Sequence, residues 1–107
     1  MTIDGYESAV QPSGVFAAFF ERDEDTAYFY LMDLRKEQGR QIVNAFNVRA
    51  AIAVILPDAI KIEWAWPDDL VGLFVGQSLC AVFDVSNGVA ARFATEGDMR
   101  RFSERLH

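Results

Sequence analysis

The sequence holds one cysteine and one histidine, the residue types that most often supply a nucleophile and its base: Cys80 and His107. We expect His107, the last residue, to lie on a fraying end where no third group can orient it. Neither Ser-His-Asp nor Cys-His catalysis is therefore predicted. Cys80 stands between Leu79 and Ala81, and reactive thiols need a polar, cationic setting, so we expect an inert buried thiol. One residue of each kind is also too few for a zinc site, and the sequence predicts a protein that is not an enzyme.

Two runs of carboxylates could bind a cation, namely Asp23-Glu24-Asp25 and Asp68-Asp69. Calcium takes about six to eight oxygens, usually from a loop with a glycine at a sharp turn, and neither run has that pattern. We expect both runs to be solvated turn tips without a bound metal. Asp23, Glu24 and Asp25 are nevertheless the candidate contacts for a basic partner. The sequence has no glycine-rich phosphate loop, so no cofactor is predicted.

Aromatic side chains are the other candidates for binding, because they could line a pocket for a small molecule. The residues concerned are Tyr28, Tyr30, Trp64 and Trp66. Trp64 and Trp66 alternate with charged and small residues, as the core-facing aromatic ladder of a strand would. The ladder is the favoured interpretation for the tryptophans, and an aromatic-lined pocket is the alternative.

Charge and hydropathy limit the partners. The formal net charge is −6 and the sequence pI is about 4.6. Nucleic-acid binding depends on basic patches, and the sequence has no run of Lys or Arg, so no nucleic acid is expected. No apolar run approaches the roughly 20 residues that span a bilayer, and the first residues do not resemble a signal peptide. We therefore expect a cytoplasmic protein without a membrane partner, whose acidity serves solubility or attracts a basic protein.

The elements that must position these residues are mostly strands. Val15–Glu21 and Thr26–Leu34 flank the first acidic run and are apolar on both faces, which predicts a hairpin of two central strands. A third strand is expected over Gln41–Val48. The spacing in 49–58 fits a helix and a strand equally well, so that segment stays unassigned.

The second half of the chain contains four further strands with clear turns. They are expected at Ala59–Trp66, Leu70–Val75, Leu79–Val85 and Val89–Ala94. Gly76-Gln77 is typical of a type II′ hairpin turn, and Asn87-Gly88 is typical of a type I′ turn.

A C-terminal helix is predicted over 96–106. Thr95 can cap it, with Asp98 in the reciprocal position of a capping box. Met99, Phe102 and Leu106 share one face, which should be buried against the sheet.

These elements predict one mainly β domain. Residues 1–14 read as a leading arm with a short strand near Tyr6 to Val10, and 15–107 form the domain. About six or seven antiparallel strands should make a strongly bent sheet or a partly closed roll or barrel, with one helix.

The strand and turn residues resemble a family of short bacterial proteins classified as a domain of unknown function. The residues that carry the resemblance are Tyr28-Phe29-Tyr30, Asp33-Leu34, Phe46-Asn47-Val48, Pro57, Ile60, Ile62, Trp64, Gly72, Gly76 and Ala81-Val82-Phe83-Asp84. The resemblance covers about residues 15–93 and leaves the C-terminal helix outside. It implies a shared fold and a bacterial source, but no activity and no catalytic residue.

The function favoured by these observations is a non-enzymatic protein-interaction module, most concretely an acidic immunity-type protein that masks a basic toxin. The alternative is a small-molecule binding domain with an aromatic-lined pocket. A homodimer is also expected, because both faces of the hairpin at 15–34 are apolar. One helix of about 11 residues spans only ~17 Å and can cover only part of the face that the core leaves open. Either the sheet curls so that both faces meet its own chain, or a second copy covers the remainder.

Overall fold

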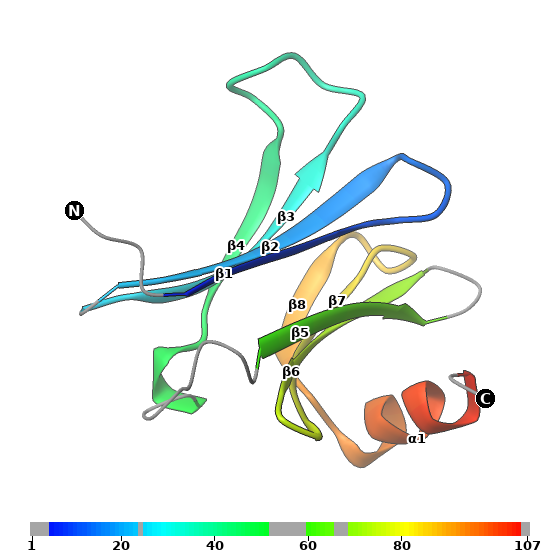
Figure 1. Ribbon diagram of the computed structural model, residues 1–107. Helices are drawn as coiled ribbons and strands as arrows, with labels where there is room; N and C mark the ends of the chain where they lie inside the picture. Colours follow the sequence, from blue (N-terminus) through cyan, green and yellow to red (C-terminus); the bar gives the residue numbers. More distant parts are fainter. Residues whose placement is uncertain (1–4, 24, 52–59, 66–68, 106–107) are drawn as a thin grey trace.

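Two antiparallel sheets of four strands each, in sequence order, form the body of the molecule (Figure 1). The computed structural model describes residues 5–23, 25–51, 60–65 and 69–105. The first sheet consists of β1 (Gly5–Val10), β2 (Phe16–Arg22), β3 (Ala27–Asp33) and β4 (Ile42–Asn47). The second consists of β5 (Ile60–Ala65), β6 (Leu70–Val75), β7 (Ser78–Asp84) and β8 (Ala90–Phe93). A short 3-10 helix, η1 (Arg49–Ala51), follows β4, and the helix α1 (Glu96–Arg105) follows β8.

The mainly β prediction with one C-terminal helix is confirmed, but its details need correction. The described residues form eight strands instead of six or seven, and they form two separate sheets instead of one bent sheet or closed barrel. β1 is the short strand predicted near Tyr6 to Val10, and it belongs to the first sheet because it pairs with β2 along its whole length. In the unassigned segment, the structure shows η1 and leaves 52–59 outside the described residues.

The predicted hairpin is β2 and β3, and its two apolar faces have different surroundings. Phe20 lies opposite Phe29 across the hairpin, and both side chains are fully buried between the two sheets. Phe19 lies opposite Tyr30 on the other face, where both are only partly buried. Neighbouring residues of a strand point to opposite faces of the sheet. One face of this hairpin therefore meets the core, and the other belongs to the outer face of the first sheet.

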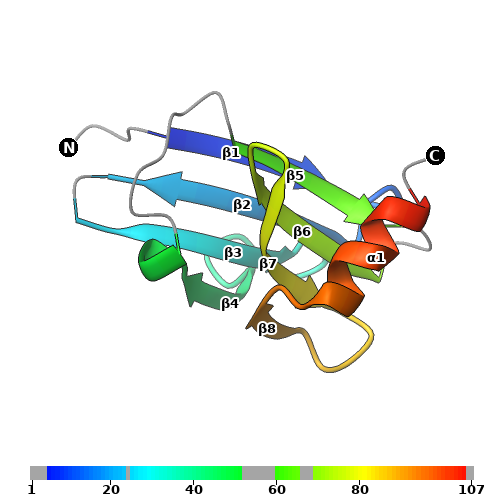
Figure 2. The same ribbon diagram turned by 90° about the horizontal axis from the view of Figure 1, so that it is seen from below.

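The core lies between the sheets and is closed along two corners. In its centre the rings of Phe29 and Phe83 have centroids 4.7 Å apart. At one corner β1 runs beside β5 (Figure 2), and the indole N–H of Trp64 donates a hydrogen bond of 3.0 Å to the Ala9 carbonyl. At the other corner β4 approaches β8, where the Asn44 amide nitrogen donates to the Val89 carbonyl at 2.9 Å.

The helix α1 covers the outer face of the second sheet (Figure 1). Phe102 is 2% exposed and meets Phe74 edge-on, with ring centroids 5.3 Å apart. Gly72 permits this approach, because a Cβ at that position would lie 2.6 Å from Leu79 Cδ1 and 2.8 Å from Phe102 Cζ. The predicted burial is therefore confirmed for Phe102. It is wrong for Met99, which is 44% exposed, and Leu106 lies outside the described residues.

The start of α1 is the predicted capping box. The Thr95 backbone N–H donates to Asp98 Oδ2 at 3.0 Å, and the Asp98 N–H donates to Thr95 Oγ1 at 3.2 Å. Asp98 can replace the longer glutamate because Arg92 also holds its carboxylate, through Nε and Nη2 at 3.1 and 2.6 Å.

One of the two predicted hairpin turns is confirmed. Gly76 has a φ of 62°, and Val75 pairs with Ser78, as a two-residue type II′ loop requires.

The other turn prediction, a type I′ turn at Asn87-Gly88, is wrong. The last pair of that hairpin is Asp84 with Ala90, and positive φ occurs at Gly88 and Val89, not at Asn87. The Asp84 carboxylate causes the difference, because its Oδ1 accepts hydrogen bonds from the backbone N–H and the hydroxyl of Ser86. This local turn ends the strand at Asp84 and makes the loop longer.

Candidate functional site

The outer face of the first sheet is not covered by α1. Because α1 packs on the second sheet, no described helix lies over this face (Figure 1). Two apolar residues on the edge strands of this face are unusually exposed to solvent. The exposed fraction is 59% for Val10 and 58% for Ile42. The residues that make up the outer face are Val10, Phe19, Glu21, Tyr28, Tyr30, Met32 and Ile42.

A shallow hollow of about 300 Å³ opens in the middle of the outer face. It is lined by Phe19, Glu21, Tyr30, Met32 and Ile42. Three adjacent strands contribute these side chains, because the register places Phe19 beside Tyr30 and Met32 beside Ile42. The pairing of β3 with β4 shifts register between Leu31 and Met32, beside this hollow. The shift brings Ile42 next to Met32.

Glu21 supplies negative charge to this hollow, and the charge of Arg49 acts on the neighbouring Asp23. Glu21 is half-buried, and within the described part of the chain it has no ion-pair partner. The pKa of Tyr30 lies above its ordinary value, chiefly because of burial and then because of the charges of Glu21, Tyr28 and Asp23. The ring of Tyr28 stacks on that of Tyr30, with centroids 5.9 Å apart. A cationic group would therefore meet aromatic faces and an uncompensated carboxylate.

The predicted acidic contacts lie in the turn between β2 and β3, close to Glu21 in the sequence. Asp23 Oδ1 accepts hydrogen bonds of 2.8 Å from the backbone N–H groups of Asp25 and Thr26. These bonds hold the pKa of Asp23 below its ordinary value and fix its carboxylate as part of the turn. Asp25 is exposed, and Glu24 lies outside the described residues.

The predicted aromatic pocket is not assembled as the sequence suggested. Tyr28 and Tyr30 stack on the outer face, whereas Trp64 packs against the core on the other side of the sheet. Trp66 lies outside the described residues. Sequence reasoning singled out neither Phe19 nor Glu21 as site residues. The available signal was a hairpin apolar on both faces, with one carboxylate in the outward row.

A scan against known protein families matches residues 4–97 to a family described as uncharacterized protein conserved in bacteria, DUF2251. The chain belongs to this family. The resemblance noted in the strands and turns is thereby confirmed over a longer stretch than 15–93. No curated protein and no solved structure matches the chain.

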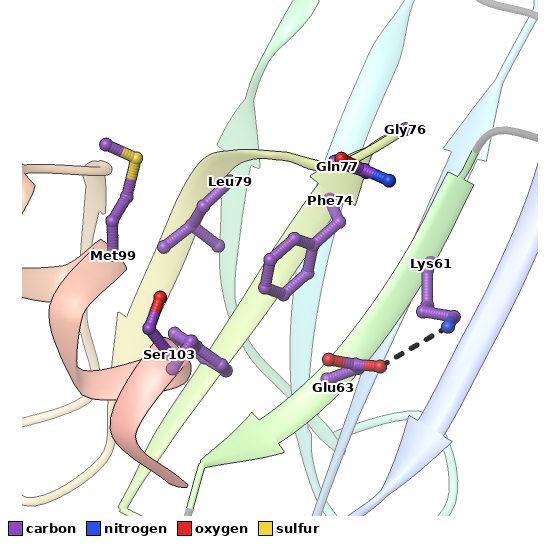
Figure 3. Close-up of a pocket in the computed structure, with 9 residues that line it drawn as sticks. Lys61, Glu63, Phe74, Gly76, Gln77, Leu79, Met99 and Ser103 are labelled. Carbon is purple, nitrogen blue, oxygen red and sulfur yellow. Dashed lines mark ion pairs between the residues drawn. The ribbon is translucent and has the colours of Figure 1, made fainter. Parts of the chain in front are cut away.

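The DUF2251 match covers the outer face completely and ends at the second residue of α1. A second hollow lies partly beyond that range. It is an open groove of about 400 Å³ between α1 and the second sheet (Figure 3). Phe74 and Leu79 form its floor, the ion pair of Lys61 and Glu63 lies on one side, and Met99 lies on the helix side.

The remaining candidates for chemistry are few. Cys80 is the extra residue at the register shift between β6 and β7, and partial burial raises the pKa of its thiol, which favours the protonated form. His107 lies outside the described residues. Within the described ranges, no three side chains of the metal-binding types stand close enough to hold an ion. No described helix has the length and apolar character needed to cross a membrane.

Proposed function

We propose that this protein is a non-enzymatic interaction module that binds a basic protein partner through the outer face of its first sheet. The observation that carries the proposal is the combination found on that face. Exposed apolar and aromatic side chains surround a hollow, and Glu21, which has no ion-pair partner among the described residues, is part of its lining.

The apolar part of the outer face supports binding. Removing apolar surface from water is the main favourable term in protein association, and aromatic residues often carry a large share of the binding energy. Tyr28 and Tyr30 present two stacked rings on a rigid strand, so they lose little conformational freedom when a partner covers them.

The charge supports a basic partner over other partners. The whole chain carries a net charge of −6, and Glu21, Asp23 and Asp25 lie at one end of the outer face. Opposite charge accelerates encounter with a basic protein and disfavours acidic competitors. An immunity-type protein that masks a basic toxin is the most concrete form of this function, since masking requires a surface and no catalytic group.

The test is affinity capture from a lysate of the source bacterium with three immobilised baits. One is the natural protein. The second is Tyr30→Arg, which places a bulky cation on the outer face. The third is the matched control Met99→Arg, which makes the same charge change at an exposed apolar residue of α1. Bound proteins are identified by mass spectrometry, and the affinity of each purified candidate is measured by calorimetry.

We expect a protein with a basic surface to bind the natural protein and Met99→Arg with similar affinity. Binding to Tyr30→Arg should be at least about tenfold weaker, because a central aromatic contact is lost and a cation faces a cation. Capture that is equally strong with all three baits would contradict the proposed surface, and the absence of any basic partner would contradict the function.

The groove beside α1 supports a second candidate, a small-molecule binding function. It combines an apolar floor with a few polar groups at its margin, which is typical of ligand sites. A thermal-shift screen of a metabolite panel would test it. A ligand should raise the unfolding temperature of the natural protein and of Tyr30→Arg, but not that of Phe74→Ala, whose ring forms the floor.

A further inference from the structure

We propose that the hollow in the outer face receives an arginine side chain of the basic partner, with Glu21 as the counter-charge of its guanidinium. This inference rests on the proposed function and specifies its partner. It is carried by the shape of the hollow, by its charge, and by a second place on the same hairpin where a guanidinium is already bound.

The lining of the hollow matches the two parts of an arginine side chain. Met32 and Ile42 form an apolar side against which the three methylene groups can pack. Phe19 and Tyr30 provide aromatic rings, and Glu21 provides the carboxylate. The volume of about 300 Å³ is at the lower end of the range for small-ligand sites, so it suits a single side chain better than a large ligand.

The same two strands hold a guanidinium of the chain itself in such a setting. Phe16 of β2 lies opposite Asp33 of β3, and the Arg35 guanidinium carbon lies 5.5 Å from the centroid of the Phe16 ring. Nε and Nη2 of Arg35 donate to the two carboxylate oxygens of Asp33 at 3.0 and 2.9 Å. There a ring and a carboxylate contact the guanidinium of an arginine that the chain itself holds two residues from Asp33, and the Arg35 backbone N–H also donates to that carboxylate at 3.0 Å. The hollow presents a ring and a carboxylate at the opposite end of the hairpin, without a cation among its lining residues.

Arginine fits the hollow better than lysine. A guanidinium is planar and weakly hydrated, so it can stack on a ring while it donates two parallel hydrogen bonds to a carboxylate. A lysine ammonium is strongly hydrated and would lose more solvation in a half-buried, aromatic setting.

The experiment uses capped amino acids as probes, namely the N-acetyl, N′-methylamide forms of arginine, lysine and citrulline. Citrulline has nearly the shape of arginine without its charge. Each probe is titrated into the ¹⁵N-labelled natural protein, and the dissociation constant is taken from the chemical shifts of backbone amides. The same titrations are made with Glu21→Gln and with the control Glu96→Gln, which removes an equal charge from an exposed position at the start of α1.

We expect capped arginine to shift amides of β2, β3 and β4 around the hollow and to saturate. Capped citrulline should bind at least about fivefold more weakly, and capped lysine should fall between them. Glu21→Gln should reduce arginine binding to the citrulline level, whereas Glu96→Gln should leave it unchanged. The spectra themselves show whether each variant is folded.

Equal binding of arginine and citrulline, unchanged binding to Glu21→Gln, or shifts confined to another surface would overturn the inference. These outcomes are distinct from a failure of the proposed function. A partner that is captured through the outer face but binds Glu21→Gln as tightly as the natural protein would remove the arginine assignment alone. A partner whose capture does not depend on Tyr30 would remove the proposed function.

Discussion

At the scale of single residues, the phenol of Tyr30 reports the electrostatic state of the hollow. Its pKa is raised by burial first and then by the negative charge of Glu21, because a nearby carboxylate opposes ionisation of the phenol. We predict that Glu21→Gln lowers the pKa of Tyr30 towards its ordinary value of 10.0, whereas Glu21→Asp, which keeps the charge, lowers it less.

The measurement is an alkaline titration followed by the ¹³C signals of the tyrosine rings, because these signals distinguish Tyr30 from the other two tyrosines. An unchanged pKa in Glu21→Gln would mean that the carboxylate does not face the phenol, and the electrostatic basis of the hollow would be lost.

Asp33 is the carboxyl group with the clearest consequence for stability. The hydrogen bonds from the Arg35 side chain lower its pKa from 3.8 to about 2 in the folded protein. A depressed pKa contributes stability that is complete above the ordinary pKa of 3.8 and is lost as the pH falls through the folded value of about 2. We therefore predict that the free energy of unfolding of the natural protein decreases as the pH falls through this range. The free energy of unfolding of Asp33→Asn should decrease less steeply.

Urea unfolding at a series of pH values between about 6 and 2 would measure these slopes. Glu37→Gln is the control, since it removes one exposed carboxyl group of the following loop. Equal slopes for the natural protein and Asp33→Asn would show that the pairing with Arg35 does not persist in solution.

At the scale of elements, the packing of Phe102 holds α1 on the second sheet, together with the ion pairs of Arg92 with Asp98 and of Arg101 with Asp69. Phe102 fills the space above Gly72, and a Cβ on Gly72 would come within 2.8 Å of the Phe102 ring. We predict that Phe102→Ala lowers the free energy of unfolding by about 3–5 kcal/mol, as is typical for a buried phenylalanine. Gly72→Ala should also destabilise, because Phe102 or Leu79 must shift to admit the new methyl group.

A double-mutant cycle measured by urea unfolding tests this contact. Gly72→Ala should be less destabilising in the Phe102→Ala background, because the ring that opposes the new methyl group is absent. Met99→Ala is the control, since its side chain is 44% exposed and should change the stability by less than about 1 kcal/mol. Additive effects of the two substitutions, or a loss below about 1 kcal/mol for Phe102→Ala, would contradict this packing.

At the scale of the whole molecule, the two sheets share one core but differ in their outer surfaces. The second sheet has α1 as its cover, whereas the first sheet leaves Tyr30 and Ile42 facing outwards. We predict that the isolated protein forms a weak dimer through the outer face, which would exclude the basic partner. Because Glu21, Asp23 and Asp25 of the two copies would repel one another, the dimer should strengthen at high salt.

Light scattering at increasing protein and salt concentration measures the dimer. The mass should rise from the 12.0 kDa of one chain towards twice that value in high salt. The mass of Ile42→Glu should stay at that of one chain at every salt concentration. Met99→Glu makes an equal change on α1, and its mass should rise with salt as that of the natural protein does. A mass of 12.0 kDa under all conditions would contradict the predicted dimer.

The sequence by itself determined the features that depend on neighbours along the chain. Alternation in Thr26–Leu34 predicted which side chains of β3 share a face, and Gly76-Gln77 predicted a two-residue turn. The capping box of Thr95 and Asp98 was also predicted, because its hydrogen bonds join residues three positions apart. Such local preferences act in any tertiary context, so a single sequence is sufficient to show them.

The tertiary structure alone decided how these elements share the core. Alternation shows which residues of a strand share a face, but it does not show which face meets the other sheet. Phe29 and Tyr30 are both large aromatic residues, so the sequence does not show that Phe29 is the buried one. Phe102 is buried and Met99 is not, because the helix approaches the sheet at Gly72. The predicted type I′ turn at Asn87-Gly88 does not form, because hydrogen bonds to Asp84 stabilise a longer loop. The hollow has the same origin, because Glu21, Tyr30 and Ile42 come from three strands whose register only the folded sheet brings together.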